Sequence, residues 1–378
     1  MRFLALVLMI CLLAVLGSAG HGNGVHEFSA PTPQASAQQP QLAVAADGTL
    51  YLVYGVDHTI YCAVSSDGGK HFSAPVAVSA RGILSLGMHR GPRVTAAGRA
   101  VIVTAILGEQ GKGRDGNLLA WRSTDHGKSW STAATLNDVA DAAREGLHSM
   151  AAGPGGLVFV TWLDLRKESS SEAGMKLYGV VSMDEGNTWG PNLLAYRSPD
   201  GSICNCCHPS TMIDSKGTIH VMWRNALAGS RDLYHLRSSD GGKTFTSAQK
   251  FGHGTWALNS CPMDGGELTV NSKGEVVSVW RREDRIYMST LDAEEVLVGH
   301  GKNPVIAYGK KGRYLAWEDA AAKNVTLLSP NQTEPRSLGT QSRYVDLAVA
   351  SNGSVAAAWE EASGQNGNKK IIKVQMLE

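Results

Sequence analysis

The side chains best suited to chemistry are concentrated in one short run of the chain. Residues 204–209 read Cys-Asn-Cys-Cys-His-Pro, which places three thiols and an imidazole within five positions. Thiolate and imidazole ligands together are typical of copper and zinc sites in proteins. Other cysteine and histidine side chains precede further apolar segments, and the full candidate set of metal ligands is His89, His148, Cys204, Cys206, Cys207, His208 and Cys261.

The same cysteines allow other assignments. A disulfide between Cys261 and either Cys206 or Cys207 is one alternative, and a redox-active thiol pair is another. Because the adjacent Cys206 and Cys207 cannot readily point to the same partner, we expect one disulfide together with free thiols or metal ligands. Cys62 lies in an apolar, strand-like run and is expected to be buried and inert.

The first twenty residues have the layout of a cleavable secretory signal. One charge, Arg2, precedes the apolar run 3–16, and small residues occupy positions 17–20. We therefore expect residues 1–20 to be removed, residues 21–378 to form one domain, and the mature protein to be secreted or periplasmic. Loss of Cys11 leaves five cysteines, so in an oxidising compartment at least one is a free thiol, a metal ligand or an intermolecular link.

Composition argues against two classes of partner. Without Arg2 the 35 basic residues become 34 and equal the 34 acidic residues, so the chain lacks the bulk positive charge that nucleic acid attracts. The N-terminal apolar run is short for a bilayer span, and no later segment approaches the required length, so we expect no membrane insertion. Binding must therefore be sought in local clusters of residues.

An eight-residue pattern, Ser-x-Asp-x-Gly-x-x-aromatic, occurs four times. The copies begin at Ser65, Ser123, Ser182 and Ser238, and their aspartates are 58, 59 and 56 residues apart. Each copy lies between two strand-like runs, and Asp and Gly are residue types that hydrogen-bond and turn the backbone. The pattern predicts four regularly spaced hairpin turns.

A second repeat extends over the whole chain. A turn glycine is followed by an apolar strand that ends six residues later in an aromatic residue or its substitute, as in Gly156/Trp162. Seven such units of about 51 residues each are long enough for four-stranded blades. We predict an all-β, seven-bladed β-propeller, with a six-bladed ring carrying one irregular insertion as the alternative. Because Glu27–Pro31 echoes the outer strand at His71–Pro75, we expect an N-terminal strand to complete the last blade and close the ring.

Propeller geometry brings distant parts of the chain together. The segments that lead into the inner strands of successive blades lie on one face, around the central channel. This face would gather residues 204–209 with His89, His148, Cys261 and Tyr344, whereas the Asp-containing turns would lie on the opposite face. The channel face is therefore the candidate site.

The four Asp-containing turns resemble the repeats of the sialidase-like, BNR or Asp-box, β-propeller superfamily, and the resemblance extends over roughly residues 25–378. It implies a propeller whose Asp boxes lie away from the active site and take no part in chemistry. It also implies what a sialidase of this superfamily requires: three arginines that pair with the substrate carboxylate, and a tyrosine nucleophile activated by a glutamate.

The resemblance assigns catalytic roles to Tyr344, Arg281 and Asp264. Tyr344 resembles the neighbourhood of the nucleophile, Arg281 or Arg282 follows a core strand where the second arginine is expected, and Asp264 replaces the glutamate. The first arginine is missing, because residues 38–40 read Gln-Gln-Pro.

We therefore expect an exported propeller without full sialidase activity. It would bind a glycan or protein ligand on its channel face, where the Cys/His/Met site would hold copper or zinc. One alternative is an exo-sialidase or related glycoside hydrolase acting on acidic sugars. The other is an interaction scaffold stabilised by disulfides.

Overall fold

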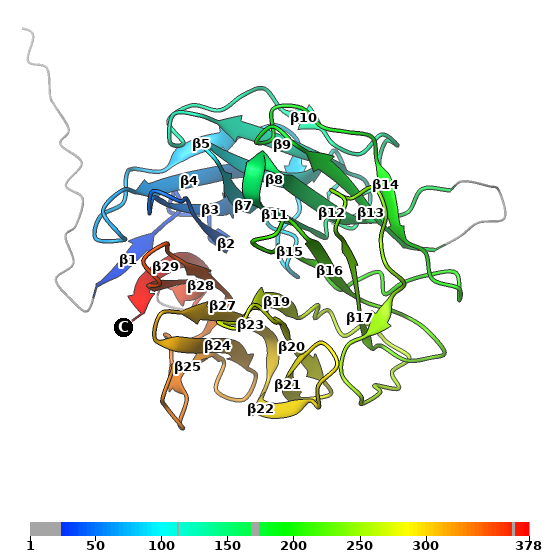
Figure 1. Cartoon of the computed structure of the whole chain (residues 1–378). Helices are drawn as coiled ribbons and strands as arrows, with labels where there is room; N and C mark the ends of the chain where they lie inside the picture. The colour runs from blue at the N-terminus through cyan, green and yellow to red at the C-terminus, as the bar shows by residue number, and fades with distance from the viewer. Residues whose placement is uncertain (1–23, 112, 168–173, 365–366, 378) are drawn as a thin grey trace, which may run out of the picture.

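Seven antiparallel sheets follow one another in a ring, and the inner strands of neighbouring sheets contact one another, which confirms the seven-bladed propeller (Figure 1). The computed structural model describes residues 24–111, 113–167, 174–364 and 367–377. The expected signal sequence, residues 1–20, lies outside these described residues. Within them, no helix is both long and apolar enough to cross a bilayer.

The first four blades are built in chain order. Blade 1 consists of β2 (Ala37–Val44), β3 (Leu50–Val56), β4 (Thr59–Ser65) and β5 (Val76–Ser79). Blade 2 consists of β7 (Arg93–Ala97), β8 (Ala100–Gly108), β9 (Asn117–Ser123) and β10 (Ala134–Thr135), with the short β6 (Ile83–Leu84) also paired to β8. Blade 3 consists of β11 (His148–Ala152), the 3-10 helix η1 (Pro154–Gly156), β12 (Val158–Asp164), β13 (Lys176–Ser182) and β14 (Leu193–Tyr196). Blade 4 consists of β15 (Ser210–Ile213), β16 (Ile219–Arg224), β17 (Leu233–Ser238) and β18 (Gln249–Lys250).

The last three blades complete the ring. Blade 5 consists of β19 (Glu267–Val270), β20 (Val276–Arg282), β21 (Arg285–Thr290) and β22 (Val296–His300). Blade 6 consists of β23 (Lys302–Gly309), β24 (Gly312–Asp319), β25 (Asn324–Leu328) and β26 (Arg336–Ser337). Blade 7 consists of β27 (Ser342–Val349), β28 (Val355–Ser363), β29 (Lys369–Leu377) and the N-terminal β1 (Val25–Phe28).

The second strand of each blade forms the core. Every residue of β3, β12 and β16 is buried, because neighbouring blades cover both faces of these strands. The aromatic residues predicted near the ends of these strands are buried here, with Trp162 and Trp223 fully inaccessible. The glycine-to-aromatic repeat therefore identified the elements that hold the blades together.

The four Asp-containing turns share one hydrogen-bond pattern. In the third, the Ser182 hydroxyl donates to Asp184 Oδ1 at 2.8 Å and the Gly186 N–H donates to Ser182 Oγ at 2.9 Å. The Thr188 N–H and hydroxyl donate to the two oxygens of Asp184 at 2.8 and 2.7 Å. These bonds, led by the Thr188 N–H, lower the pKa of Asp184 to about 2. The turn-closing Trp189 packs against the core, as the pattern predicted.

The ring closes through its N-terminal strand. β1 pairs antiparallel with β29, with Phe28 opposite Ile372. The Phe28 ring also packs on Tyr54 and Phe72 of blade 1, at centroid distances of 6.1 and 5.4 Å. The expected closure is confirmed, and the strand spans 25–28.

Candidate functional site

Three inner strands begin with a β-bulge on the channel face. The pairing register shifts near the start of β2, β23 and β27, and the residues Gln39, Asn303 and Tyr344 at these shifts have positive φ of 54°, 52° and 51°. A bulge re-aims a side chain, and strained backbone positions of this kind cluster at functional sites.

Each bulged backbone is fixed by a carboxylate of the preceding blade. The Asn303 N–H donates to Asp264 Oδ2 at 2.7 Å, and the Tyr344 N–H donates to Glu318 Oε1 at 2.9 Å. The Gln39 N–H donates to Glu360 Oε2 at 3.2 Å across the junction between blades 7 and 1. Asp264, expected as a substitute catalytic base, is completely buried and positions a neighbouring strand.

Two predicted histidines meet Tyr344 at the mouth of the channel. The His89 ring lies 4.5 Å from the His208 ring and 5.0 Å from the Tyr344 ring, measured between centroids. The Tyr344 hydroxyl accepts a hydrogen bond from the Met88 N–H at 3.0 Å, and the Met88 side chain is exposed at the rim. Ring geometry therefore brought His89, His208 and Tyr344 together as expected.

Several buried polar atoms around these rings have no hydrogen-bond partner. They are Gln39 Nε2, His89 Nε2, Asp264 Oδ1 and Asn303 Oδ1. The Asn303 amide lies close enough to His89 to influence its pKa, yet the two groups do not reach hydrogen-bond geometry. An unsatisfied buried polar group costs about 1–3 kcal/mol, so a cluster of them is a candidate place for ordered water or a ligand. We call this group the channel-mouth site: Gln39, His89, His208, Asp264, Asn303 and Tyr344.

Burial sets the protonation states at this site. It lowers the pKa of His89 to about 3, with the positive charge of Arg93 adding to the shift, and lowers the pKa of His208 well below its usual value. Burial also raises the pKa of Tyr344. At neutral pH the two imidazoles are therefore neutral and the phenol keeps its proton.

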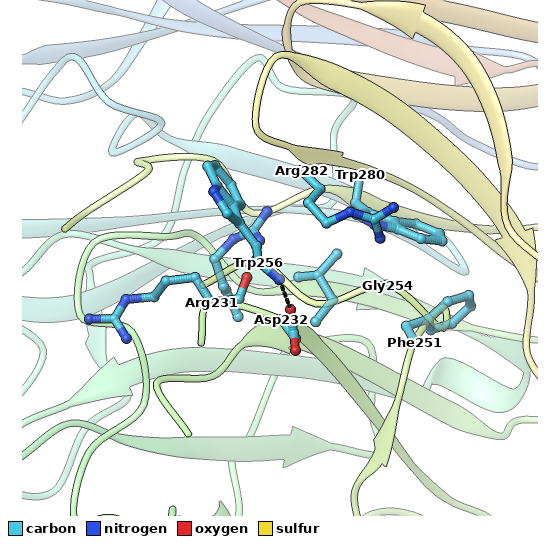
Figure 2. A pocket seen from close by; sticks show the side chains of 9 residues that line it. Arg231, Asp232, Phe251, Gly254, Trp256, Trp280 and Arg282 are labelled. Atoms are coloured by element: carbon cyan, nitrogen blue, oxygen red, sulfur yellow. Dashed lines mark hydrogen bonds between the residues drawn. The ribbon is translucent and has the colours of Figure 1, made fainter. Parts of the chain in front are cut away.

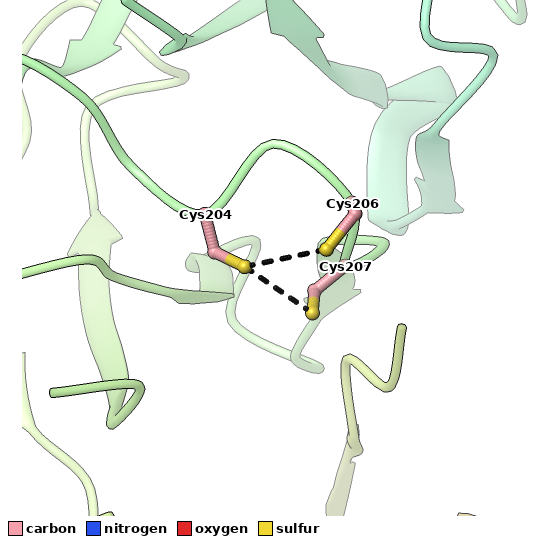
Figure 3. A group of neighbouring side chains, drawn as sticks. All are labelled: Cys204, Cys206 and Cys207. Atoms are coloured by element: carbon pink, nitrogen blue, oxygen red, sulfur yellow. Dashed lines mark hydrogen bonds between the residues drawn. The ribbon is translucent and has the colours of Figure 1, made fainter. Parts of the chain in front are cut away.

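The cysteines form a compact cluster beside this site (Figure 3). A disulfide joins Cys206 and Cys261, whose Cα atoms are 6.2 Å apart. Cys204 Sγ lies 3.6 Å from Cys206 Sγ and 3.5 Å from Cys207 Sγ. Of the two disulfides expected as alternatives, the structure contains the one through Cys206, and Cys204 and Cys207 are free.

The predicted metal ligands do not form a single cluster. Among the described residues, the sulfurs of Cys204, Cys206 and Cys207 are the one set of three or more potential ligand atoms within 4.8 Å of one another. His89 and His208 belong to the channel-mouth site instead. His148 is buried in β11, where its Nε2 lies 3.1 Å from the Thr104 hydroxyl of blade 2.

The two free thiols have unequal acidities. Their mutual hydrogen bond, followed by the Cys206 N–H and the charges of Arg224 and Arg231, lowers the pKa of Cys204, whereas burial raises that of Cys207 well above its usual value. Cys207 Sγ also accepts from the Asp264 N–H at 3.4 Å. Cys62, by contrast, is buried alone in β4, and burial raises its pKa to about 12, in line with the inert thiol expected there.

Arginines of blades 4 and 5 are engaged by the protein itself, and Figure 2 shows Arg231 and Arg282 among the side chains that line a small cavity with Trp256. Arg224 donates to the carbonyl oxygens of Asp264 and Arg281 at 2.8 and 3.0 Å, and Arg282 pairs with Glu295. Arg281, expected to bind a carboxylate, donates to the Glu283 carbonyl oxygen, and its guanidinium lies 5.4 Å from the Trp256 ring centroid. The cavity beneath Trp256 measures about 10 Å³, which leaves space for about one water molecule.

Sequence reasoning missed Asn303 and Arg93. Arg93 Nη2 donates to the His89 carbonyl oxygen at 2.5 Å and supports that residue from below. The sequence did contain a signal for Asn303. Proline directly follows Gln39, His208 and Asn303 at the start of three inner strands. Proline disfavours helical backbone in the preceding residue, so the repeat marks equivalent positions.

Comparisons with known proteins agree on the fold. No family model and no curated protein matches the sequence. An α-L-arabinanase of Penicillium chrysogenum complexed with arabinobiose aligns with a TM-score of 0.53 and 13% identity, over 93% of this chain and 96% of that one. A streptogramin B lyase aligns with a TM-score of 0.53 and 12% identity over 93% and 97%. The NanB sialidase of Streptococcus pneumoniae aligns with a TM-score of 0.52 and 10% identity over 93% and 70%, so what the three share with this chain is the propeller fold.

Proposed function

We propose that this chain is an exported, sialidase-like Asp-box propeller that binds a neutral, hydroxyl-rich glycan at the channel-mouth site. The observation that carries the proposal is the set of buried polar atoms without partners at Gln39, His89, Asp264 and Asn303. A hydroxyl both donates and accepts, so a polyol can satisfy amide, imidazole and carboxylate atoms together. The Tyr344 ring adds an apolar surface beside them.

The same geometry argues against the sialidase alternative. Among the described residues no carboxylate hydrogen-bonds the Tyr344 hydroxyl, which accepts from the Met88 N–H. Asp264 binds the Asn303 N–H, and the Arg281 side chain lies against Trp256. A tyrosine without an activating base and a carboxylate clamp without free arginines do not support cleavage of an acidic sugar.

Titration calorimetry with arabinobiose, other neutral oligosaccharides and sialyllactose tests this proposal. We expect binding of a neutral sugar that weakens at least ~10-fold in Asn303→Gly, because glycine keeps the positive φ and the Asp264 contact but removes the amide. Thr188→Ala, on the opposite face, is the matched control and should bind normally. Sialyllactose hydrolysis that disappears in Tyr344→Phe would establish the hydrolase instead, and binding of proteins alone would point to a scaffold.

A second proposal concerns the two free thiols of the cluster, because Cys204 Sγ and Cys207 Sγ lie 3.5 Å apart. Cys204 and Cys207 would hold a copper or zinc ion, because thiolates select soft metals such as Cu(I) and Zn²⁺. The test is metal stoichiometry after loading, with titration of free thiols alongside. Cys204→Ser and Cys207→Ser should lose the metal, and Cys62→Ser should retain it. A protein that takes up no metal in any form would be the disulfide-stabilised scaffold.

Export is tested separately. N-terminal sequencing of the protein from the periplasm or medium should find a chain that begins close to residue 21. Recovery of the protein with its first twenty residues intact inside the cytoplasm would contradict this part of the proposal.

A further inference from the structure

We propose that the Cys206–Cys261 disulfide gates the metal site, so that its reduction converts a two-thiolate site into a four-thiolate site. This inference rests on the second proposal above and adds the regulation of the same site. The oxidised protein offers the free thiols Cys204 and Cys207 to a metal ion. The reduced protein adds Cys206 and Cys261, which the disulfide otherwise withholds.

The sulfur positions already approach those of a tetrahedral thiolate site. With metal–sulfur bonds of ~2.3 Å, neighbouring sulfurs of such a site lie about 3.8 Å apart. Cys204 Sγ lies 3.6 Å from Cys206 Sγ and 3.5 Å from Cys207 Sγ, so three corners need only small shifts (Figure 3). Cys261 is the candidate for the fourth corner: the disulfide holds its sulfur against Cys206, outside the three-sulfur set, and it must move toward Cys204 and Cys207 once that bond is broken.

Exposure makes the disulfide the accessible part of the cluster. Cys261 is exposed and Cys206 half-buried, whereas Cys204 and Cys207 are buried. A soluble dithiol therefore reaches the Cys261 sulfur first. Its thiolate attacks Cys261 Sγ, the bond to Cys206 breaks, and Cys206 leaves as a thiolate.

The second thiol of the reductant completes the exchange. It loses its proton and attacks the reductant's sulfur in the mixed disulfide, which releases Cys261 as a thiolate and the reductant as a cyclic disulfide. Two electrons have then passed from the dithiol to the protein disulfide, and its two thiol protons have gone to solvent. Both new thiolates are available to the metal ion.

The surroundings suit a site with excess negative charge. Four thiolates around a divalent ion carry a net charge of about −2, which needs nearby donors and cations. The charges of Arg224 and Arg231 act on Cys204, and the Asp264 N–H donates to Cys207 Sγ at 3.4 Å. The cluster therefore has positive and polar neighbours that stabilise the fully reduced, metal-bound form.

The experiment compares oxidised and reduced full-length protein in a Zn²⁺ competition titration against a chromophoric chelator. Reduction is carried out with dithiothreitol, which is removed without air, and alkylation with mass mapping verifies which cysteines are free. We expect the reduced protein to bind Zn²⁺ at least ~100-fold more tightly. Co²⁺ loading should give the intense visible bands of a tetrahedral thiolate site in the reduced protein and not in the oxidised one.

Variants separate the gate from the metal site. Cys261→Ser should bind tightly without reduction, because Cys206 is then free, and Cys62→Ser should behave as the unmodified protein in both states. Equal Zn²⁺ affinity in the oxidised and reduced proteins would overturn the gate and leave the metal site standing. No Zn²⁺ binding in either state, with mapping that shows all four cysteines reduced, would overturn both.

Discussion

On the face that carries the Asp-containing turns, four blades repeat one set of hydrogen bonds. On the channel face, by contrast, the residues at the start of the inner strands differ from blade to blade. In each turn the Asp oxygens accept from donors within the same eight residues, as Asp184 does from Ser182 and Thr188. On the channel face, Asn303 and Tyr344 depend on carboxylates of the preceding blade. Buried polar atoms without partners are found beside them.

This difference suggests that the face with the Asp-containing turns serves the stability of the fold and that the channel face serves the proposed binding. A turn whose Asp and Ser oxygens accept from its own donors can be repeated wherever a hairpin is needed. A site that leaves donors and acceptors unmatched weakens the fold locally and gives a ligand something to complete. Removing a polar side chain should therefore lower stability on the face with the Asp-containing turns and weaken binding on the channel face.

Gly265→Ala should have the largest effect, because it forces apart two segments of the channel face. A Cβ there would collide with the His208 carbonyl oxygen and lie 2.9 Å from the His208 ring. We expect the free energy of unfolding to fall by about 3 kcal/mol and glycan binding to be lost. Urea denaturation measures the first and calorimetry the second. Gly190→Ala, whose Cβ would meet only the Val181 oxygen at 3.5 Å, is the control, and equal behaviour of the two variants would contradict the close approach.

Asp184→Ala should lower stability and leave binding unchanged. It removes the acceptor for the Ser182 hydroxyl and for both Thr188 donors. We expect a loss of about 2 kcal/mol in the free energy of unfolding, measured by urea denaturation. A parallel loss of glycan affinity would show that the two faces are not independent.

Asp346→Asn should flatten the pH dependence of stability. Burial raises the pKa of Asp346 from 3.8 to about 7, so its contribution is complete below pH ~4 and is lost as the pH rises through 7. Asparagine keeps an acceptor for the Leu42 N–H, which donates to Asp346 Oδ2 at 2.7 Å. Between pH 4 and 7, the slope of unfolding free energy against pH should therefore differ between the unmodified protein and the variant by at most about 1.4 kcal/mol per pH unit. Parallel profiles for the two proteins would contradict a buried, protonated Asp346.

The variant is needed as a reference because buried histidines change the free energy of unfolding with pH in the opposite direction. Burial lowers the pKa of His148 to about 3, so its contribution is complete above pH ~6.5 and is lost as the pH falls toward 3. Both proteins contain His148, so its contribution cancels in the difference between their profiles.

Asn303→Gly should have the smallest effect on stability. Glycine adopts the φ of 52° readily and keeps the backbone bond to Asp264, while the unpartnered amide oxygen disappears. We expect the free energy of unfolding to change by less than about 1 kcal/mol, although glycan binding weakens at least ~10-fold. A large loss of stability would show that the amide serves the fold.

Much of the fold could be predicted because its signals are local. The Ser-x-Asp turns contain their own hydrogen bonds, and the glycine-to-aromatic repeat spans a single buried strand. The ring geometry then placed His89, His208 and Tyr344 on one face. Asn303 escaped prediction because its role depends on a bulge and on Asp264 of another blade, which no local pattern records.

The assignment of the thiols depended on side-chain direction. Cys206 and Cys207 are adjacent, but Cys206 reaches the exposed Cys261, while Cys207 is buried and accepts from the Asp264 N–H. The sequence therefore left both disulfides open. It also placed seven ligands in one metal site, whereas His89 and His208 meet at the channel-mouth site, His148 is buried beside Thr104, and the sulfurs gather separately.

Asp264 has a place in both neighbourhoods. Its peptide nitrogen contacts the Cys207 sulfur, and its carboxylate fixes the backbone of Asn303. If both proposals hold, a shift of that sulfur on binding an ion would tilt the Asp264 peptide and move the Asn303 amide that we propose contacts a sugar. Sugar affinity measured before and after reduction would then report whether the disulfide is formed, through Asn303, which itself takes no part in the redox reaction.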